Sequence, residues 1–122
     1  MAHRTFSGVR DKVLGLIEPA LEALERGGRE RELADLQSVL RQLLIDLMVL
    51  LERDPGIEAA AADLFATASA LVRDTAAGHQ PGPRHLRLFR EARVRFRERL
   101  VAARPSEQGT KIVWRQYELL CA

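Results

Sequence analysis

The sequence LLIDLMVLL, residues 43–51, contains a single polar residue, Asp46. It closes a run in which leucine recurs at alternating spacings of three and four, at positions 33, 36, 40, 43, 47 and 50. That spacing is the a/d pattern of a helix that packs against other helices. Beyond residue 43, apolar side chains surround the helix, and a helix that is apolar all round is buried. The sequence therefore predicts a central helix over residues 29–53.

Glycine and proline divide the rest of the chain into further helical segments. The breaks fall at residues 27–28, 54–56, 78–83 and 105–106. Apolar residues between them recur with a helical period, which predicts helices over 7–26, 56–76 and 83–104. Short connections favour antiparallel neighbours. We expect an all-α fold: an antiparallel bundle of four main helices plus a short C-terminal helix, forming one helical-bundle domain over residues 1–122.

Local signals refine the helix ends. Ser7 is suited to cap the first helix, and Gly27 is suited to end it in a left-handed conformation. Pro19 removes one backbone donor and is expected to kink or split that helix. Residues 110–121 are ambiguous, since 112–114 look strand-like, but no partner strand is expected elsewhere. We therefore predict a short helix there.

The apolar surplus of the central helix predicts self-association. Eight of the nine residues 43–51 are apolar. This is more than one face of a helix needs inside a four-helix bundle. We expect a homodimer whose interface is formed by Leu40, Leu43, Leu44, Leu47, Met48 and Leu51. The alternative is a central helix covered entirely by its own chain. Asp46 is expected to mark a solvent-facing line of the helix; if buried, it needs a partner such as an arginine of 83–104.

Composition sets broad limits. The formal net charge is +2, with 47% hydrophobic and 30% charged residues, which is typical of a globular domain. Cys121 is the only cysteine, so an intramolecular disulfide is excluded. The first residues show no signal-peptide pattern, and the longest apolar cluster is about half the length of a membrane span. We expect a cytoplasmic protein with no membrane contact.

Positive charge is concentrated in the segment 84–104. It contains eight arginines against two glutamates, Glu91 and Glu98, a local net charge of +6. Arginine favours planar pairing with carboxylate or phosphate. The side chains expected to bind a partner are Arg87, Arg90, Arg93 and Arg97. An acidic protein or nucleic acid could be that partner, but we favour pairing within the chain, with carboxylates such as Glu18, Glu22, Glu25, Glu30, Glu32 and Asp35.

The C-terminal segment contains the only tryptophan and the only tyrosine, Trp114 and Tyr117. Such aromatic anchors often dominate binding interfaces, so both are candidate partner-binding residues. Docking onto the chain's own bundle or across the dimer is the favoured alternative.

No motif predicts a catalytic, metal or cofactor site. The three histidines, His3, His79 and His85, lack the spacing of a metal site. Arg73 and His79 are separated by five residues, which resembles the arginine–histidine signature of HEPN ribonucleases. Those are helical bundles that work as dimers, so this two-residue resemblance implies a dimeric ribonuclease with both residues near a shared cleft.

We expect a non-enzymatic protein–protein interaction module, such as an adaptor, chaperone or regulator. It would act as a helical-bundle homodimer with the arginine-rich helix as its contact surface. One alternative is a nucleic-acid-associated regulator that binds phosphates through helix 84–104. The other is the HEPN-like dimeric ribonuclease.

Overall fold

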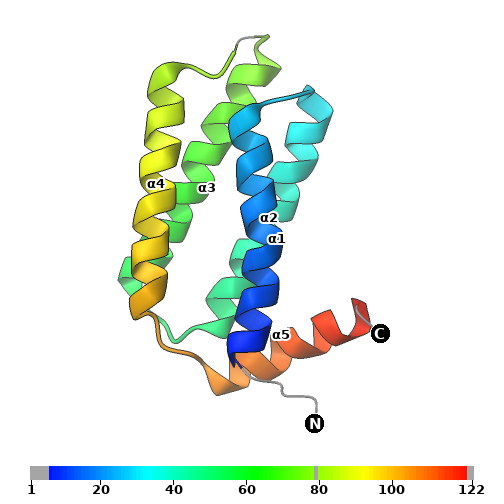
Figure 1. Cartoon of the computed structure of the whole chain (residues 1–122), viewed down its shortest axis with the longest axis vertical. Coiled ribbons are helices and arrows are strands. Elements are labelled where there is room, and N and C mark those ends of the chain that lie inside the picture. The colour runs from blue at the N-terminus through cyan, green and yellow to red at the C-terminus, as the bar shows by residue number, and fades with distance from the viewer. Residues whose placement is uncertain (1–5, 79, 121–122) are drawn as a thin grey trace.

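A computed structural model of the chain describes residues 6–78 and 80–120, and within them it contains five α-helices (Figure 1). They are α1 (Phe6–Arg26), α2 (Glu30–Leu50), α3 (Pro55–Ala76), α4 (Pro83–Ala102) and α5 (Glu107–Leu120). The four long helices run side by side, and α5 lies across one end of them (Figure 1). The prediction of an all-α bundle of four main helices and a short C-terminal helix is confirmed.

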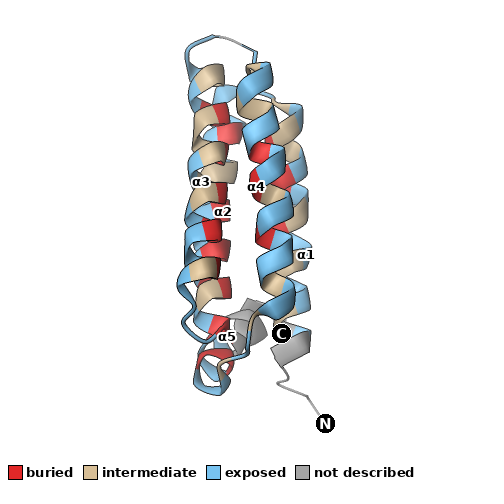
Figure 2. Cartoon of the chain, turned by 90° about the vertical axis from the view of Figure 1, so that its left-hand side faces the viewer, coloured by how far each residue is buried: buried red, intermediate tan, exposed pale blue. Residues whose placement is uncertain are grey.

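The core fills the space between the four long helices. Figure 2 shows the buried positions on the sides of the helices that face one another. The largest fully buried side chains come from every long helix: Ile17, Leu21, Leu24, Leu33, Leu40, Leu47, Leu50, Ile57, Leu64, Leu71 and Phe89. The a/d leucines of α2 therefore face the core, as their spacing predicts, although Leu36 is only half-buried.

The ends of α1 only partly follow the sequence signals. Gly27 has a φ of 80° and ends α1 as predicted. The helix already begins at Phe6, so Ser7 lies in its first turn. The predicted cap concerns the side chain of Ser7, which lies outside the described residues. Pro19 does not split α1. Both Pro19 and Gly15, whose carbonyl loses a hydrogen bond, are exposed, so water can replace that bond.

The helix α2 ends at Leu50, three residues before the predicted end of 29–53. The next residue, Leu51, is extended and forms an isolated antiparallel bridge with Pro105. In the same place the backbone N–H of Ser106 donates to the carbonyl of Leu50 at 2.8 Å. The segment after α2 therefore pairs with the α4–α5 linker instead of continuing the helix.

Asp46 is buried, with 7% of its surface exposed, so the prediction of a solvent-facing position is wrong. Its carboxylate accepts a hydrogen bond from Gln42 Nε2, one turn earlier on α2, at 3.0 Å. Most of the apolar side chains of residues 43–51 are thus covered by the chain itself, and the charged side chain of Asp46 is covered with them.

The helix α5 closes the lower end of the bundle in Figure 1 and packs against α2 and α1. It starts earlier than the predicted 110–121 because Ser106 caps it: the Ser106 hydroxyl accepts from the N–H of Gly109 at 3.2 Å. A Cβ added to Gly109 would overlap the backbone carbonyl of Val49. The backbones of α5 and α2 are therefore in contact where the two helices cross, at Gly109. One turn later, Val113 is buried in the core.

Candidate interaction surfaces

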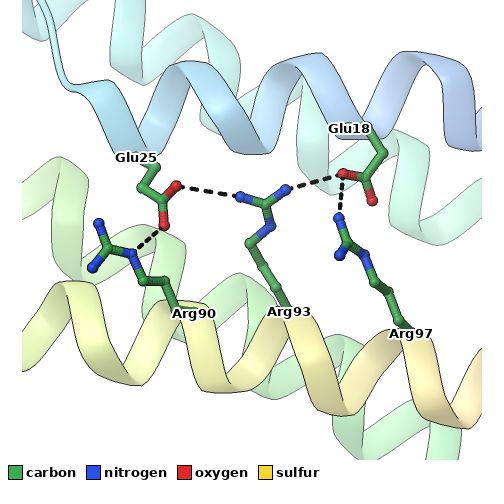
Figure 3. Close-up of polar contacts among 5 residues, drawn as sticks. All are labelled: Glu18, Glu25, Arg90, Arg93 and Arg97. Carbon is green, nitrogen blue, oxygen red and sulfur yellow. Dashed lines mark hydrogen bonds and ion pairs between the residues drawn. The ribbon is translucent and has the colours of Figure 1, made fainter.

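Arginines of α4 bind carboxylates of α1 in the seam between these two helices (Figure 3). Arg93 lies between two glutamates: its Nη2 is 3.0 Å from Glu18 Oε2 and its Nη1 is 3.5 Å from Glu25 Oε2. Arg90 Nε donates to Glu25 Oε1 at 2.7 Å, and Arg97 Nη2 donates to Glu18 Oε2 at 2.8 Å. We call these five residues the α1–α4 ion-pair ladder.

The ladder spans a gap that the backbones leave open. The backbones of α1 and α4 approach each other less closely than those of α1 and α2, α2 and α3, or α3 and α4. Long arginine side chains can cross such a distance, with their methylene stems over the core and their charged ends together. Arg93 is the most enclosed member, with only 12% of its side chain exposed. The carboxylates of Glu18 and Glu25 therefore compensate the charge of Arg93.

The pKa of Glu18 reflects two opposing effects. Burial raises it, but hydrogen bonds and charges from Arg97 and Arg93 lower it more, so the pKa lies below its ordinary value of 4.5. The carboxylate consequently stays charged in the folded protein and strengthens the contact between α1 and α4.

All four arginines predicted to bind a partner therefore have a carboxylate partner inside the chain, three of them on α1. Arg90, Arg93 and Arg97 belong to the ladder, and Arg87 lies 4.0 Å from Glu91 on its own helix. Of the carboxylates proposed for internal pairing, Glu18 and Glu25 do pair with α4. A further pair, between Arg95 and Asp63 of α3 at 2.9 Å, was not anticipated from the sequence.

The residues predicted to form the dimer interface lie mostly inside the chain's own core. Leu40, Leu43, Leu44, Leu47 and Leu51 are each between 0% and 6% exposed. Only Met48 is half-buried. A second copy would therefore have to contact α2 mainly through other side chains, although Leu44 and Met48 also line the groove on its outer side.

Those other side chains are found on the outer side of α2 and α3. Ile45 and Val49 of α2 are 46% and 38% exposed, although both are large and apolar. They line an open groove of about 530 Å³ between α2 and α3. The residues that line this α2–α3 groove are Arg41, Leu44, Ile45, Met48, Val49, Arg53, Glu58, Ala61, Ala62 and Phe65. Its floor and walls are apolar, and its three charged residues stand at its ends.

The sequence contained a signal for this groove that our interface prediction did not use. Ile45 and Val49 are one helical turn apart and lie off the a/d positions. The a/d positions face the core of the bundle, so apolar residues beside them mark a second, outward face. The interface prediction instead took five core residues and left out Ile45 and Val49.

A second polar cluster joins α3 to the start of α4. His85 Nδ1 lies 2.6 Å from Asp74 Oδ2, and the same oxygen accepts from the N–H of Gly82 at 3.2 Å. Asp74 thus binds the first turn of α4, where a negative charge is favoured by the helix dipole. The sequence did not reveal this pair because its members are eleven residues apart on different helices. The contacts indicate that it fixes the α3–α4 connection.

The remaining predicted site residues can be placed only in part. Arg73 is exposed near the end of α3, whereas His79 lies outside the described residues, so the HEPN-like pair cannot be compared with the structure. The side chains of Trp114 and Tyr117 and the whole of Cys121 also lie outside them. Over the described part of the chain, no three residues of the metal-binding types come together.

We compared the chain with protein-family models, with curated proteins and with solved structures, and none of them matches it. None of the helices in residues 6–78 and 80–120 combines the length and the apolar content that a membrane span requires.

Proposed function

We propose that the chain is a non-enzymatic protein-interaction module, of the adaptor, chaperone or regulator kind, that acts as a helical-bundle homodimer. The α2–α3 groove is its contact surface. The observation that supports this proposal is the exposure of Ile45 and Val49 beside an open apolar groove. The sequence alone suggested α4 as the contact surface, but the arginines of α4 are largely paired within the chain. We therefore propose the groove between α2 and α3 instead.

The composition of the groove resembles that of a protein interface. Binding surfaces combine an apolar centre with a polar rim, and arginine, methionine and aromatic residues are enriched in them. Here Ile45, Val49 and Phe65 form the apolar part, and Arg41 and Arg53 stand at its ends. The small side chains of α3 in the groove leave room for a partner's residues to enter. The short length of the apolar stretch favours a dimer of micromolar affinity.

Sedimentation velocity, measured from low to high micromolar concentration, tests the proposal. The wild-type chain is expected to shift from monomer to dimer across this range. The double variant Ile45→Glu/Val49→Glu should stay monomeric, because dimerisation would remove the introduced carboxylates from water in the apolar centre of the groove.

Val39→Glu is the matched control, since Val39 lies on α2, is 50% exposed and does not line the groove. This variant should dimerise like the wild type, and circular dichroism should show the same helix content in all three proteins. A wild type that remains monomeric, or a groove variant that still dimerises, would contradict the proposal.

A further inference from the structure

Charged residues stand at both ends of the α2–α3 groove. Arg53 and Glu58 lie at the end next to the α2–α3 turn, with side chains that are 95% and 45% exposed and with Arg53 Nε 3.9 Å from Glu58 Oε1. A pair this exposed contributes little within one chain. Arg41 lies at the other end, about three turns earlier on α2. All three residues are exposed and can contact another molecule.

The α2–α3 hairpin sets the height of each residue along the groove. The two helices are antiparallel and joined by a short turn, so residues at equal distances from the turn lie level with each other. Counted from the middle of residues 51–54, the height of Arg41 is within one residue of that of Phe65, and the height of Ile45 is within one residue of that of Ala61. The α2 side of the groove is basic at both ends, whereas the α3 side is acidic at the turn end and aromatic at the other.

Two copies that meet through this face can do so in two limiting ways, because a two-fold contact repeats every interaction twice. If the two-fold axis crosses the helices, α2 packs on α2 of the second copy, and Arg41 meets Arg53 of that copy at both ends. If the axis runs along the helices, α2 packs on α3 of the second copy. Each Arg53 then meets a Glu58, and each Arg41 lies over a Phe65 ring, which favours a cation.

We infer that the groove binds a second copy of this chain with α2 of each copy against α3 of the other, and that Arg53 and Glu58 select this arrangement. The inference rests on the proposed homodimer and adds its geometry. Shape supports it as well as charge: Ile45 and Val49 project from α2, and the facing positions of α3 are occupied by Ala61 and Ala62. Like charges deter the alternative packing of α2 on α2.

Charge reversal tested in trans distinguishes the two arrangements. Arg53→Glu places two glutamates face to face at both Arg53–Glu58 contacts, which lie side by side at the turn end of the dimer, and Glu58→Lys places two cations at each of these contacts. Each variant alone should dimerise about tenfold more weakly than the wild type, because the symmetry applies each repulsion twice. An equimolar mixture of the two should form a heterodimer of nearly wild-type affinity, since both contacts are then attractive. Fluorescence anisotropy of a labelled Arg53→Glu chain, titrated with Glu58→Lys, measures this affinity.

The outcomes separate this inference from the proposed function. If Ile45→Glu/Val49→Glu abolishes the dimer but the mixture gains nothing over either variant alone, the arrangement is wrong and the homodimer stands. If Arg53→Glu dimerises more tightly than the wild type, α2 packs on α2, because the introduced carboxylate then meets Arg41 of the second copy. If the wild type never dimerises, both the proposed function and the inference fall. A pairing of Arg53 with Glu58 only within each chain cannot produce recovery on mixing.

Discussion

The α1–α4 seam and the α2–α3 face differ in whether the chain covers their side chains with partners of its own. Across the α1–α4 seam the backbones lie apart, and the ion-pair ladder of Glu18, Glu25 and three arginines fills the gap. On the α2–α3 face the backbones are close, yet Ile45 and Val49 remain exposed. The first region is complete within one chain, whereas the second leaves apolar surface in contact with water.

This difference shows that a surplus in composition does not by itself locate a binding surface. The arginines of α4 are the larger anomaly in the sequence, but most of them have carboxylate partners in the same chain. The apolar surplus of α2 is largely absorbed by the core, and only its outward part remains for a partner. Apolar residues of α2 at the a/d positions are buried in the core, whereas those beside the a/d positions face outward and remain available to a partner.

Leu47→Ala is expected to give the largest effect. Leu47 is completely buried in the chain's own core, so its truncation leaves a cavity and should reduce the free energy of unfolding by about 2–5 kcal/mol. Urea denaturation followed by circular dichroism measures this loss. The loss should persist at concentrations where the protein is monomeric. A loss seen only in the dimer would instead place Leu47 at the interface.

Gly109→Ala tests the contact between α2 and α5. The added methyl group would overlap the Val49 carbonyl, so we expect a loss of about 3 kcal/mol through displacement of α5. Gly15→Ala in α1 is the matched control, because nothing lies near its Cβ position, and it should stabilise by about 0.5–1 kcal/mol. Equal effects of the two substitutions in thermal denaturation would show that α5 does not contact α2 at Gly109.

Arg93→Ala tests the ladder at its most enclosed member. Two carboxylates lose a charged partner, which should cost about 2 kcal/mol. Arg97→Ala, which removes a side chain that is 57% exposed, should cost less than about 1 kcal/mol. Chemical denaturation of both variants checks this order. If the two cost the same, the ladder would be an ordinary surface feature and would not close the seam.

The smallest expected effect is the pH dependence due to Glu18. Its pKa is lower in the folded than in the unfolded chain, so its contribution to stability is present above pH 4.5 and is lost as the pH falls through the folded-state pKa. Glu18→Gln should therefore flatten the acid side of the stability–pH profile. Glu22→Gln, an exposed change on the same helix, should leave the profile steeper. Identical profiles for the two variants would show that Glu18 does not contribute to the pH dependence of stability.

Periodicity and helix-breaking residues sufficed to predict the bundle, because both are local properties of the sequence. The ladder was predicted only as a class, arginines of residues 84–104 with carboxylates of residues 18–35, since the individual partners depend on how α1 and α4 are rotated. Two contacts join residues on different helices: the pair of Asp74 with His85, and the crossing of α2 by α5 at Gly109. No local sequence pattern predicts either of them. The interface prediction chose α2 but selected its core-facing side, because a leucine repeat does not say which chain covers it.

The central claim is that the α2–α3 face binds a second copy while the α1–α4 seam is complete within the chain. Nitrogen–proton correlation spectra recorded during dilution test it directly at each residue. We predict that the amide signals of Ile45, Val49 and Ala62 shift as the dimer dissociates, while those of Glu18, Arg93 and Arg97 stay in place. Signals that shift in the seam and remain fixed along the groove would contradict the claim.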